Sequence, residues 1–348
     1  MRKLYLMRSL ISFCFFLLFL SCSDNPSTQH FSSVEIEDLF TDSVSIRALE
    51  VMDGSVAFAG TGGVFGAIDL STEQIRAKQQ RYDTLYPEFR AVGHTQSDFF
   101  MLSAGRPALL FKTGNQGLME LVYKEDKEGV FYDSMAFWNN SEGLAIGDEM
   151  DGCLSLLVTR DGGSSWRKIP CSELPKAIPG EGAFAASNTN IALFEDKAWI
   201  GTTEGRIFYS PDKGSTWEVF KTPINSKEPT QGIYSLHFTS ENKGIAMGGD
   251  YTEPEGKTGN KALTLDGGKT WSLVADGDIP GYTSCVQFVP GSGGNGIMAV
   301  SYSGVSYSAN MGKQWTKLSE EPFYTLRFVN DSTAYAAGKF RISRLSFK

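Results

Sequence analysis

The sequence is poor in the residues that build metal and redox sites. It has three histidines, His30, His94 and His237, which lie far apart and without metal-ligand spacing. It has no Cys-x-x-Cys, no Cys-x-x-Cys-His and no Gly-x-Gly-x-x-Gly between a strand and a helix. We therefore predict no metal and no cofactor, which leaves an oxidoreductase without a reactive group.

Basic residues are also scarce relative to acidic ones. The chain has 32 Lys and Arg against 40 Asp and Glu, a formal net charge of −8. Removal of residues 1–21, which carry three basic and no acidic residues, would change this to −11. An acidic surface argues against nucleic acid and anionic lipid as partners.

Residues 1–21 have the pattern of a secretory signal, with a basic start and then an apolar run. Residues 19–22, FLSC, resemble a bacterial lipobox, which implies cleavage before Cys22 and a lipid on its thiol. Residues 22–33 would then be a tether, and the lipid would hold the protein at a membrane surface without a spanning segment. The alternative is an ordinary signal peptide with a chance cysteine. We expect an exported protein, lipid-anchored at the bacterial cell envelope and either periplasm-facing or in the outer membrane.

One motif recurs along the chain and reads as a hairpin turn. Its copies are TRDGGSSW at 159–166, SPDKGSTW at 210–217, TLDGGKTW at 264–271 and SANMGKQW at 308–315, with a degenerate one at 113–120. This spacing indicates one supersecondary unit repeated. Asp can accept hydrogen bonds from amides further along the turn, Gly allows positive φ and Trp covers the turn. We assign a structural role to Asp161, Trp166, Asp212, Trp217, Asp266, Trp271, Asn310 and Trp315.

Short apolar segments surround each turn. Phrases such as SIRALEV at 45–51 and GAFAAS at 182–187 read as inner strands, and phrases such as VAFAGTGG at 56–63 read as the strands that follow. Seven such units without helical periodicity predict an all-β protein, a seven-bladed β-propeller with four-stranded antiparallel blades. The spare segment Val34–Leu39 would close the last blade. Six blades are the alternative, and residues 34–348 form a single domain in either case.

The turn motifs resemble those of BNR/Asp-box repeat propellers. FRAV at 89–92 and the terminal YTLRF with AAGK resemble more closely the photosystem II stability/assembly factor family and related exported bacterial propellers. The resemblance covers residues 34–348. It implies the propeller fold and a protein or extended peptide partner held over the central bowl. Some related propellers are catalogued as oxidoreductases or glycoside hydrolases, so the fold does not decide the function.

The first residues of the inner strands should converge at one mouth of the central channel. In register they include Arg47, Arg90, Asp133, Tyr234 and Tyr324, with Arg327 further along the last strand. Arginines beside tyrosines suit a carboxylate or acidic peptide, because a guanidinium can hold a carboxylate by two hydrogen bonds. The structural alternative is a ring of ion pairs in which Arg47, Arg90 and Asp133 neutralise one another.

Two classes of function follow. The first is a monomeric protein-binding or peptide-binding module that acts like an assembly factor. The second is a sialidase-like glycoside hydrolase with catalysis in the bowl, since sialidases carry Asp-box turns and residues 340–343, FRIS, nearly match their Phe-Arg-Ile-Pro motif. We favour the binding module, because only Asp133 and Tyr234 could supply an acid–base or nucleophile pair.

The cysteines indicate one disulfide. Cys153 and Cys171 flank the turn at 161–165 at nearly equal distances, so hairpin pairing places them opposite each other or nearly so. An oxidising envelope permits the bond. Cys285, on a predicted inner strand, is expected to be a buried free thiol.

Overall fold

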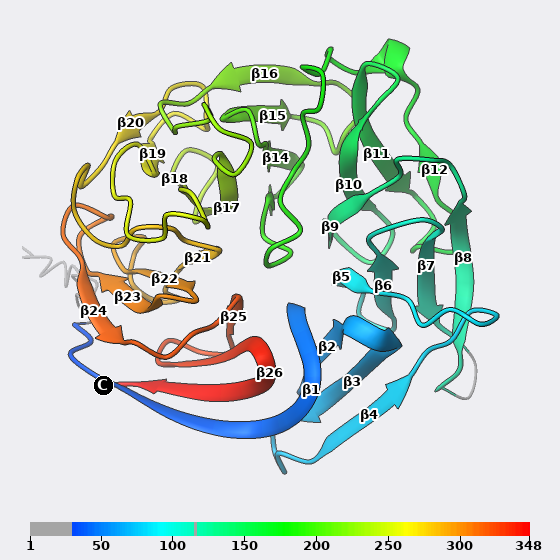
Figure 1. Cartoon of the computed structure of the whole chain (residues 1–348), viewed down its shortest axis with the longest axis horizontal. Helices are drawn as coiled ribbons and strands as arrows, with labels where there is room; N and C mark the ends of the chain where they lie inside the picture. The colour runs from blue at the N-terminus through cyan, green and yellow to red at the C-terminus, as the bar shows by residue number, and fades with distance from the viewer. Residues whose placement is uncertain (1–29, 115–116) are drawn as a thin grey trace, which may run out of the picture.

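Among the described residues, the regular structure is β-strand, apart from short 3₁₀ turns such as η1 (Thr61–Gly63) and η3 (Cys171–Glu173). The computed structural model describes residues 30–114 and 117–348. Five antiparallel sheets have four strands each: β5 (Phe89–His94), β6 (Phe99–Ser103), β7 (Ala108–Thr113) and β8 (Met119–Glu125); β9 (Tyr132–Phe137), β10 (Gly143–Met150), β11 (Cys153–Thr159) and β12 (Arg167–Lys168); β13 (Ile191–Phe194), β14 (Lys197–Gly201), β15 (Arg206–Ser210) and β16 (Glu218–Lys221); β17 (Ile233–Phe238), β18 (Gly244–Gly248), β19 (Lys261–Thr264) and β20 (Ser272–Leu273); β21 (Cys285–Phe288), β22 (Ile297–Ser301), β23 (Gly304–Ser308) and β24 (Thr316–Ser319). The sheets stand radially around one axis, as the blades of a propeller (Figure 1).

The sixth sheet corrects the predicted number of blades. It has six strands in the order β25 (Thr325–Phe328), β26 (Thr333–Phe347), β1 (Val34–Met52), β2 (Ser55–Gly60), β3 (Val64–Asp69) and β4 (Ile75–Gln79). The prediction of seven separate four-stranded blades is therefore wrong, and the structure has six. The reason is that β1 does not end after residue 39: its first part pairs with β26 and its second part, from Ile46, pairs with β2. One continuous strand thus joins the first and last predicted units.

The core lies between neighbouring blades. One buried cluster, for example, combines Phe100 and Leu102 of β6 with Met135 of β9 and Leu157 of β11. Both faces of a blade are covered in this way, so β6 is buried at every residue. A strand that is buried on both faces reads as an apolar run rather than as an alternating pattern. This explains the small, apolar phrases found in every unit of the sequence.

The four complete turn motifs share one hydrogen-bond pattern. In the turn after β15, the Asp212 carboxylate accepts from Thr216 N at 2.7 Å, and Ser210 Oγ accepts from Gly214 N at 2.8 Å. The indole N–H of Trp217 donates to Gly214 O at 3.1 Å. The same bonds recur in the other turns, except that the Trp166 indole has no partner. The motif thus closes a hairpin at the outer edge of a blade.

One predicted inner strand is wrong. The segment 182–187 was expected to be a strand, but β13 begins only at Ile191, and residues 182–190 form a loop. This segment, which we call the central loop, contacts inner strands on several sides of the ring. Asn188 alone bonds to backbone atoms of Val92 and Met135, in two different blades. The loop therefore fills the central channel that the predicted inner strands were expected to surround.

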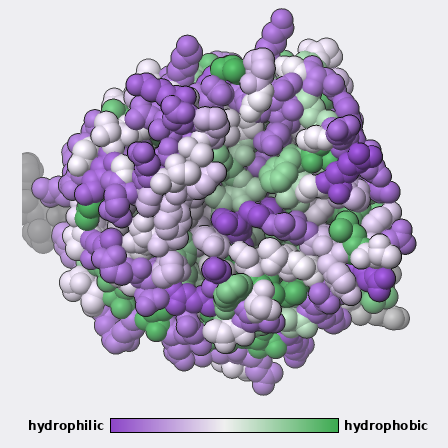
Figure 2. Space-filling model, in the orientation of Figure 1, coloured by the Kyte–Doolittle hydropathy of each residue, from purple (hydrophilic) through white to green (hydrophobic). Residues whose placement is uncertain are grey.

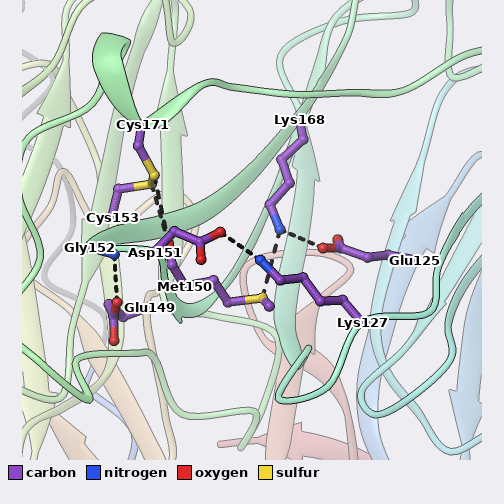
Figure 3. The surroundings of a disulfide bond; sticks show 9 residues. All are labelled: Glu125, Lys127, Glu149, Met150, Asp151, Gly152, Cys153, Lys168 and Cys171. Carbon is purple, nitrogen blue, oxygen red and sulfur yellow. Dashed lines mark hydrogen bonds and ion pairs between the residues drawn. A yellow bond between two sulfur atoms is a disulfide. The ribbon is translucent and has the colours of Figure 1, made fainter.

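The structure also places the cysteines. A disulfide joins Cys153, at the start of β11, to Cys171 of η3, with the Cα atoms 5.5 Å apart, and Cys285 is a buried free thiol. Figure 3 shows this disulfide beside the ion pairs Lys127–Asp151 and Lys168–Glu125.

The predicted signal at 1–21 and the lipidation site Cys22 lie outside the described residues. Within the part of the chain that is described, no helix has the length and apolar character needed to cross a bilayer.

Candidate functional site

Local irregularities in the inner strands present the predicted bowl residues. In four inner strands the pairing with the next strand skips one residue, and the skipped residues are Arg47, Arg90, Asp133 and Tyr234. Such β-bulges bend a strand and change the direction of a side chain, and they are frequent next to functional sites. The same device in four blades therefore places one non-pairing residue per blade near the start of the channel.

The central loop forms the floor of this mouth. The Arg90 guanidinium donates to Ala185 O at 3.2 Å and that of Arg47 to Ala186 O at 3.5 Å. Further along, Thr325 Oγ1 donates to Ser187 O at 2.9 Å. The strands that carry these residues lie on one side of the ring, and Ser235 of β17, across the ring, accepts from Thr189 Oγ1 at 2.7 Å, so the loop backbone is fixed at the axis. The mouth is therefore a closed bowl, not the end of an open channel.

A cavity of about 430 Å³ occupies this bowl. It is lined by arginine, alanine and aromatic residues: Arg47, Arg90, Phe131, Ala183, Phe184, Ala185, Ala186, Tyr234, Tyr251, Tyr282, Tyr302 and Tyr324. The face turned to the viewer in Figure 2 is hollowed near the axis of the ring. A concave site of this size with a few convergent polar groups is the usual form of a ligand site. The structure thus brings four of the six predicted site residues together: Arg47, Arg90, Tyr234 and Tyr324.

The two arginines differ in their partners within the protein. The Arg47 guanidinium lies 4.0 Å from the centre of the Tyr324 ring, a cation–π contact. Arg90 forms an ion pair with Glu88 at the rim. Burial and the nearby charge of Arg90 lower the pKa of Arg47. An anionic group of a ligand placed near both guanidiniums would therefore stabilise their charged forms. The site suits a carboxylate.

Asp133 does not take part in the bowl as predicted. It is fully buried, and neither carboxylate oxygen has a hydrogen-bond partner. Burial, together with the nearby Asp148, raises its pKa well above the usual range. Of the ion pairs among the described residues, none joins Asp133 to Arg47 or Arg90, so the neutralising ring is not formed.

Arg327 and the sialidase-like segment also lie away from the cavity. Arg327 is buried on the other side of the central loop, where it donates to Asn188 O at 3.3 Å and lies 3.9 Å from Glu50. Arg341, in the segment that resembles a sialidase motif, forms an ion pair with Glu321 at 2.9 Å. Neither residue lines the bowl.

Sequence reasoning missed much of the aromatic lining. Phe184, Tyr251, Tyr282 and Tyr302 all come from loops or turns, where periodicity gives no information. The available signal was the density of tyrosines between the predicted strands of the last units. The rings touch in series: Phe184 stacks on Tyr234 at 3.6 Å, Tyr234 meets Tyr282 at 4.9 Å, and Tyr282 meets Tyr302 at 5.2 Å. We call the rings of Phe184, Tyr234, Tyr282 and Tyr302 the aromatic ladder.

The opposite mouth of the ring has a different chemistry. A cavity of about 450 Å³ there is lined by Glu50, His94 and Trp138, among others. His94 Nδ1 lies 3.3 Å from the Glu50 carboxylate, and this hydrogen bond raises the pKa of His94. Among the described residues, no group of three or more His, Cys, Asp or Glu side chains could hold a metal ion. Of these two cavities, the one in the bowl is lined by the arginines and the aromatic ladder.

Comparison with solved structures establishes the fold. YCF48 bound to a D1 peptide superposes with a TM-score of 0.66 at 12% sequence identity, over 92% of this chain and 96% of that one. The WD40 repeats of RRP9 give 0.65 at 12% identity over 90% and 98%, and YCF48 from Cyanidioschyzon merolae gives 0.63 at 12% over 91% and 98%. At this identity the similarity concerns the propeller alone.

Sequence comparison gives less. The family model Sortilin-Vps10 (sortilin, neurotensin receptor 3) matches residues 154–279, which is less than half of the chain. No curated protein matches significantly in sequence. The function must therefore be argued from the bowl.

Proposed function

We propose that this chain is a peptide-binding propeller that holds a carboxylate-bearing segment of a partner protein in its bowl, as an assembly factor does. The observation that carries the proposal is the pair Arg47 and Arg90, both held by the central loop in the wall of one cavity. Among the described residues Arg47 has no ion-pair partner, and Arg90 has one, Glu88 at the rim. Charge-assisted hydrogen bonds from guanidinium to carboxylate are among the stronger protein contacts. The YCF48 neighbour, a photosystem II assembly factor whose structure contains a D1 peptide, supports this class of ligand.

The test is a capture experiment from envelope membranes with the full chain. We expect the double variant Arg47→Ala/Arg90→Ala to lose partner binding about tenfold or more, because each charge-assisted contact contributes roughly 1.5–3 kcal/mol. The loss should shrink as salt rises, since salt screens the wild-type contact. The matched control is Arg76→Ala/Arg167→Ala, which removes the same charge from exposed positions on outer strands.

Two results would overturn the proposal. If the double variant binds every recovered partner as well as the wild type, the bowl is structural. If the wild type turns over sialosides or other glycosides, and Asp133→Asn abolishes the turnover, the protein is a hydrolase. Salt-sensitive partner binding without turnover supports the binding module.

We also propose that the protein is exported and anchored to the envelope through a lipid on Cys22. The support is the signal pattern of residues 1–21 and the lipobox-like segment that ends at Cys22. The Cys22→Ala variant should appear in the soluble fraction or remain unprocessed. A variant that is processed and membrane-bound like the wild type would show that there is no lipid anchor.

A further inference from the structure

The bowl has a second half that the arginines do not explain. The aromatic ladder leads from Phe184, on the central loop, to Tyr302, at the turn between β22 and β23. At the rim, the Tyr302 hydroxyl donates to the carbonyl of Tyr251. Tyr302, the last ring of the ladder, is 36% exposed and the neighbouring Tyr251 is 49% exposed, so a ligand can reach both rings at the rim. Rigid aromatic faces of this kind bind proline and aromatic side chains.

Acidic groups lie beside this end of the ladder. Asp250 directly precedes Tyr251, whose carbonyl accepts from the Tyr302 hydroxyl, and Glu255 lines a small neighbouring cavity that shares Tyr282 with the bowl. Asp250 is held in its own turn by bonds to Thr252. Glu255 is exposed and, within the described chain, has no hydrogen bond or ion pair for its side chain. Its charge is therefore free to act on a ligand.

The bowl is thus electrically polarised. Two guanidiniums lie on the side of β1 and β5, where Glu88 pairs with Arg90 at the rim. Beside the bowl, in the loop that follows β18, lie the carboxylates of Asp250 and Glu255, neither of which has an ion-pair partner among the described residues. A ligand with a single charge would meet attraction at one side and repulsion at the other. Complementary charge at both sides selects partners and fixes their register. The ligand that satisfies both sides carries charges of opposite sign, with an apolar part between them.

We propose that the bowl is specific for an extended peptide that has a carboxylate at one end, a basic side chain at the other and a proline or aromatic residue between. The carboxylate lies on Arg47 and Arg90, the middle residue lies on the aromatic ladder, and the basic side chain lies toward Asp250 and Glu255. This inference rests on the proposed function and adds the chemistry of its ligand.

The test is selection of a random octapeptide library with free C-termini against the immobilised full chain. We expect the wild type to enrich peptides in which an acidic residue or the C-terminus is separated from Lys or Arg by Pro, Tyr, Phe or Trp. The variant Glu255→Gln should reduce the enrichment of Lys and Arg, and Glu255→Lys should abolish it, while the acidic enrichment stays. The control Asp331→Lys makes the same charge change in the loop after β25, at the opposite end of the inner strands.

Each outcome separates this inference from the proposed function. If Arg47→Ala/Arg90→Ala removes the acidic preference and the Glu255 variants leave the basic preference unchanged, the polarised bowl is wrong and the binding module stands. If the wild type enriches no motif at all, both are wrong. If Asp331→Lys acts like Glu255→Lys, the effect is one of net charge, and the assignment to the bowl fails.

Discussion

Two kinds of position repeat from blade to blade: the turns at the outer edges and the bulges at the start of the inner strands. They differ in whether the residue type is repeated as well. The turns contain nearly the same residues in the same hydrogen bonds: Asp161, Asp212, Asp266 and Asn310 each accept from the amide four residues later. The bulges keep one backbone geometry but hold Arg47, Arg90, Asp133 and Tyr234. A position that repeats its residue serves what the blades share, which is folding. A position that keeps its geometry and varies its residue can build a site that occurs once.

An aspartate of β10 beside the central loop also differs in its electrostatics from the turn aspartates. In the turn, hydrogen bonds from Ser165 lower the pKa of Asp161. Near the bowl, burial raises the pKa of Asp148 to about 6. The turn carboxylate is therefore stabilised in its charged form, and the bowl-side carboxylate is destabilised in it.

The largest effect is expected from the loop on which the bowl is built. Asn188→Ala would leave the amides of Val92 and Met135 and the Val92 carbonyl without partners, at about 1–3 kcal/mol each. We expect a loss of about 3 kcal/mol or more in the free energy of unfolding, together with weaker peptide binding, measured by urea denaturation and by titration. Asn242→Ala, an exposed asparagine in a turn, is the control. Unchanged binding by a stable Asn188→Ala protein would contradict the role of the loop as the floor.

The next effect tests the turn alone. Asp212→Ala should lower the free energy of unfolding by roughly 1–3 kcal/mol, because it removes the acceptor for the amides of Ser215 and Thr216. Binding measured well below the melting temperature should stay the same. Loss of binding at unchanged stability would mean that the turn is part of a site, and the contrast between the two regions would fail.

A smaller effect should appear with pH. Because the folded pKa of Asp148 is about 6 and its ordinary value is 3.8, the folded protein binds the proton more tightly between these values. Stability should therefore fall as pH rises from about 4 to about 6, by about 1–2 kcal/mol after allowance for partial solvent screening. Denaturation midpoints of wild type and Asp148→Asn across this range give the measurement. If the stability difference between wild type and Asp148→Asn does not change with pH, the pKa of Asp148 is not raised in the folded protein.

The smallest effect concerns the backbone of one turn. The fourth position of the motif has positive φ in every complete copy; it is Gly162 and Gly267 in two of them but Met311, at φ 59°, in the last. Met311→Gly should stabilise the protein by about 0.5–1 kcal/mol, because a side chain is disfavoured in this conformation. Thermal denaturation measures it. The same change at Leu318, in β24, should destabilise.

The sequence was sufficient for the fold class and for the repeated turns, but not for the number of blades. The turn motif predicted the all-β propeller class and the hairpins, and the register of the apolar phrases located Arg47, Arg90, Tyr234 and Tyr324 at one mouth. The prediction of seven blades was wrong, because periodicity gives the number of repeated units but does not show that β1 continues without a break from one unit into the next.

The sequence was insufficient where a segment departs from the repeat. GAFAAS at 182–187 has the composition of an inner strand, yet it lies in the central loop, and the partners of this loop at Val92, Ser235 and Thr325 are far away in sequence. Local pattern carries no information about such contacts. The raised pKa of Asp133 also depends on contacts distant in sequence: burial raises it and Asp148 raises it further, and the Asp148 carboxylate accepts from Ala183 N of the central loop.

The pairing of the two chain ends has a consequence for the order of folding. β1 and β26, at opposite ends of the sequence, bond along Val34–Ser45 and Lys339–Phe347, so the ring cannot close until the last strand has been made. The central loop, in mid-sequence, receives its bonds from Thr325 and Arg327 only at that stage. The floor of the bowl is therefore among the last parts to form during synthesis. We expect a nascent or truncated chain to be unable to hold a ligand there, so that binding itself reports a completed ring.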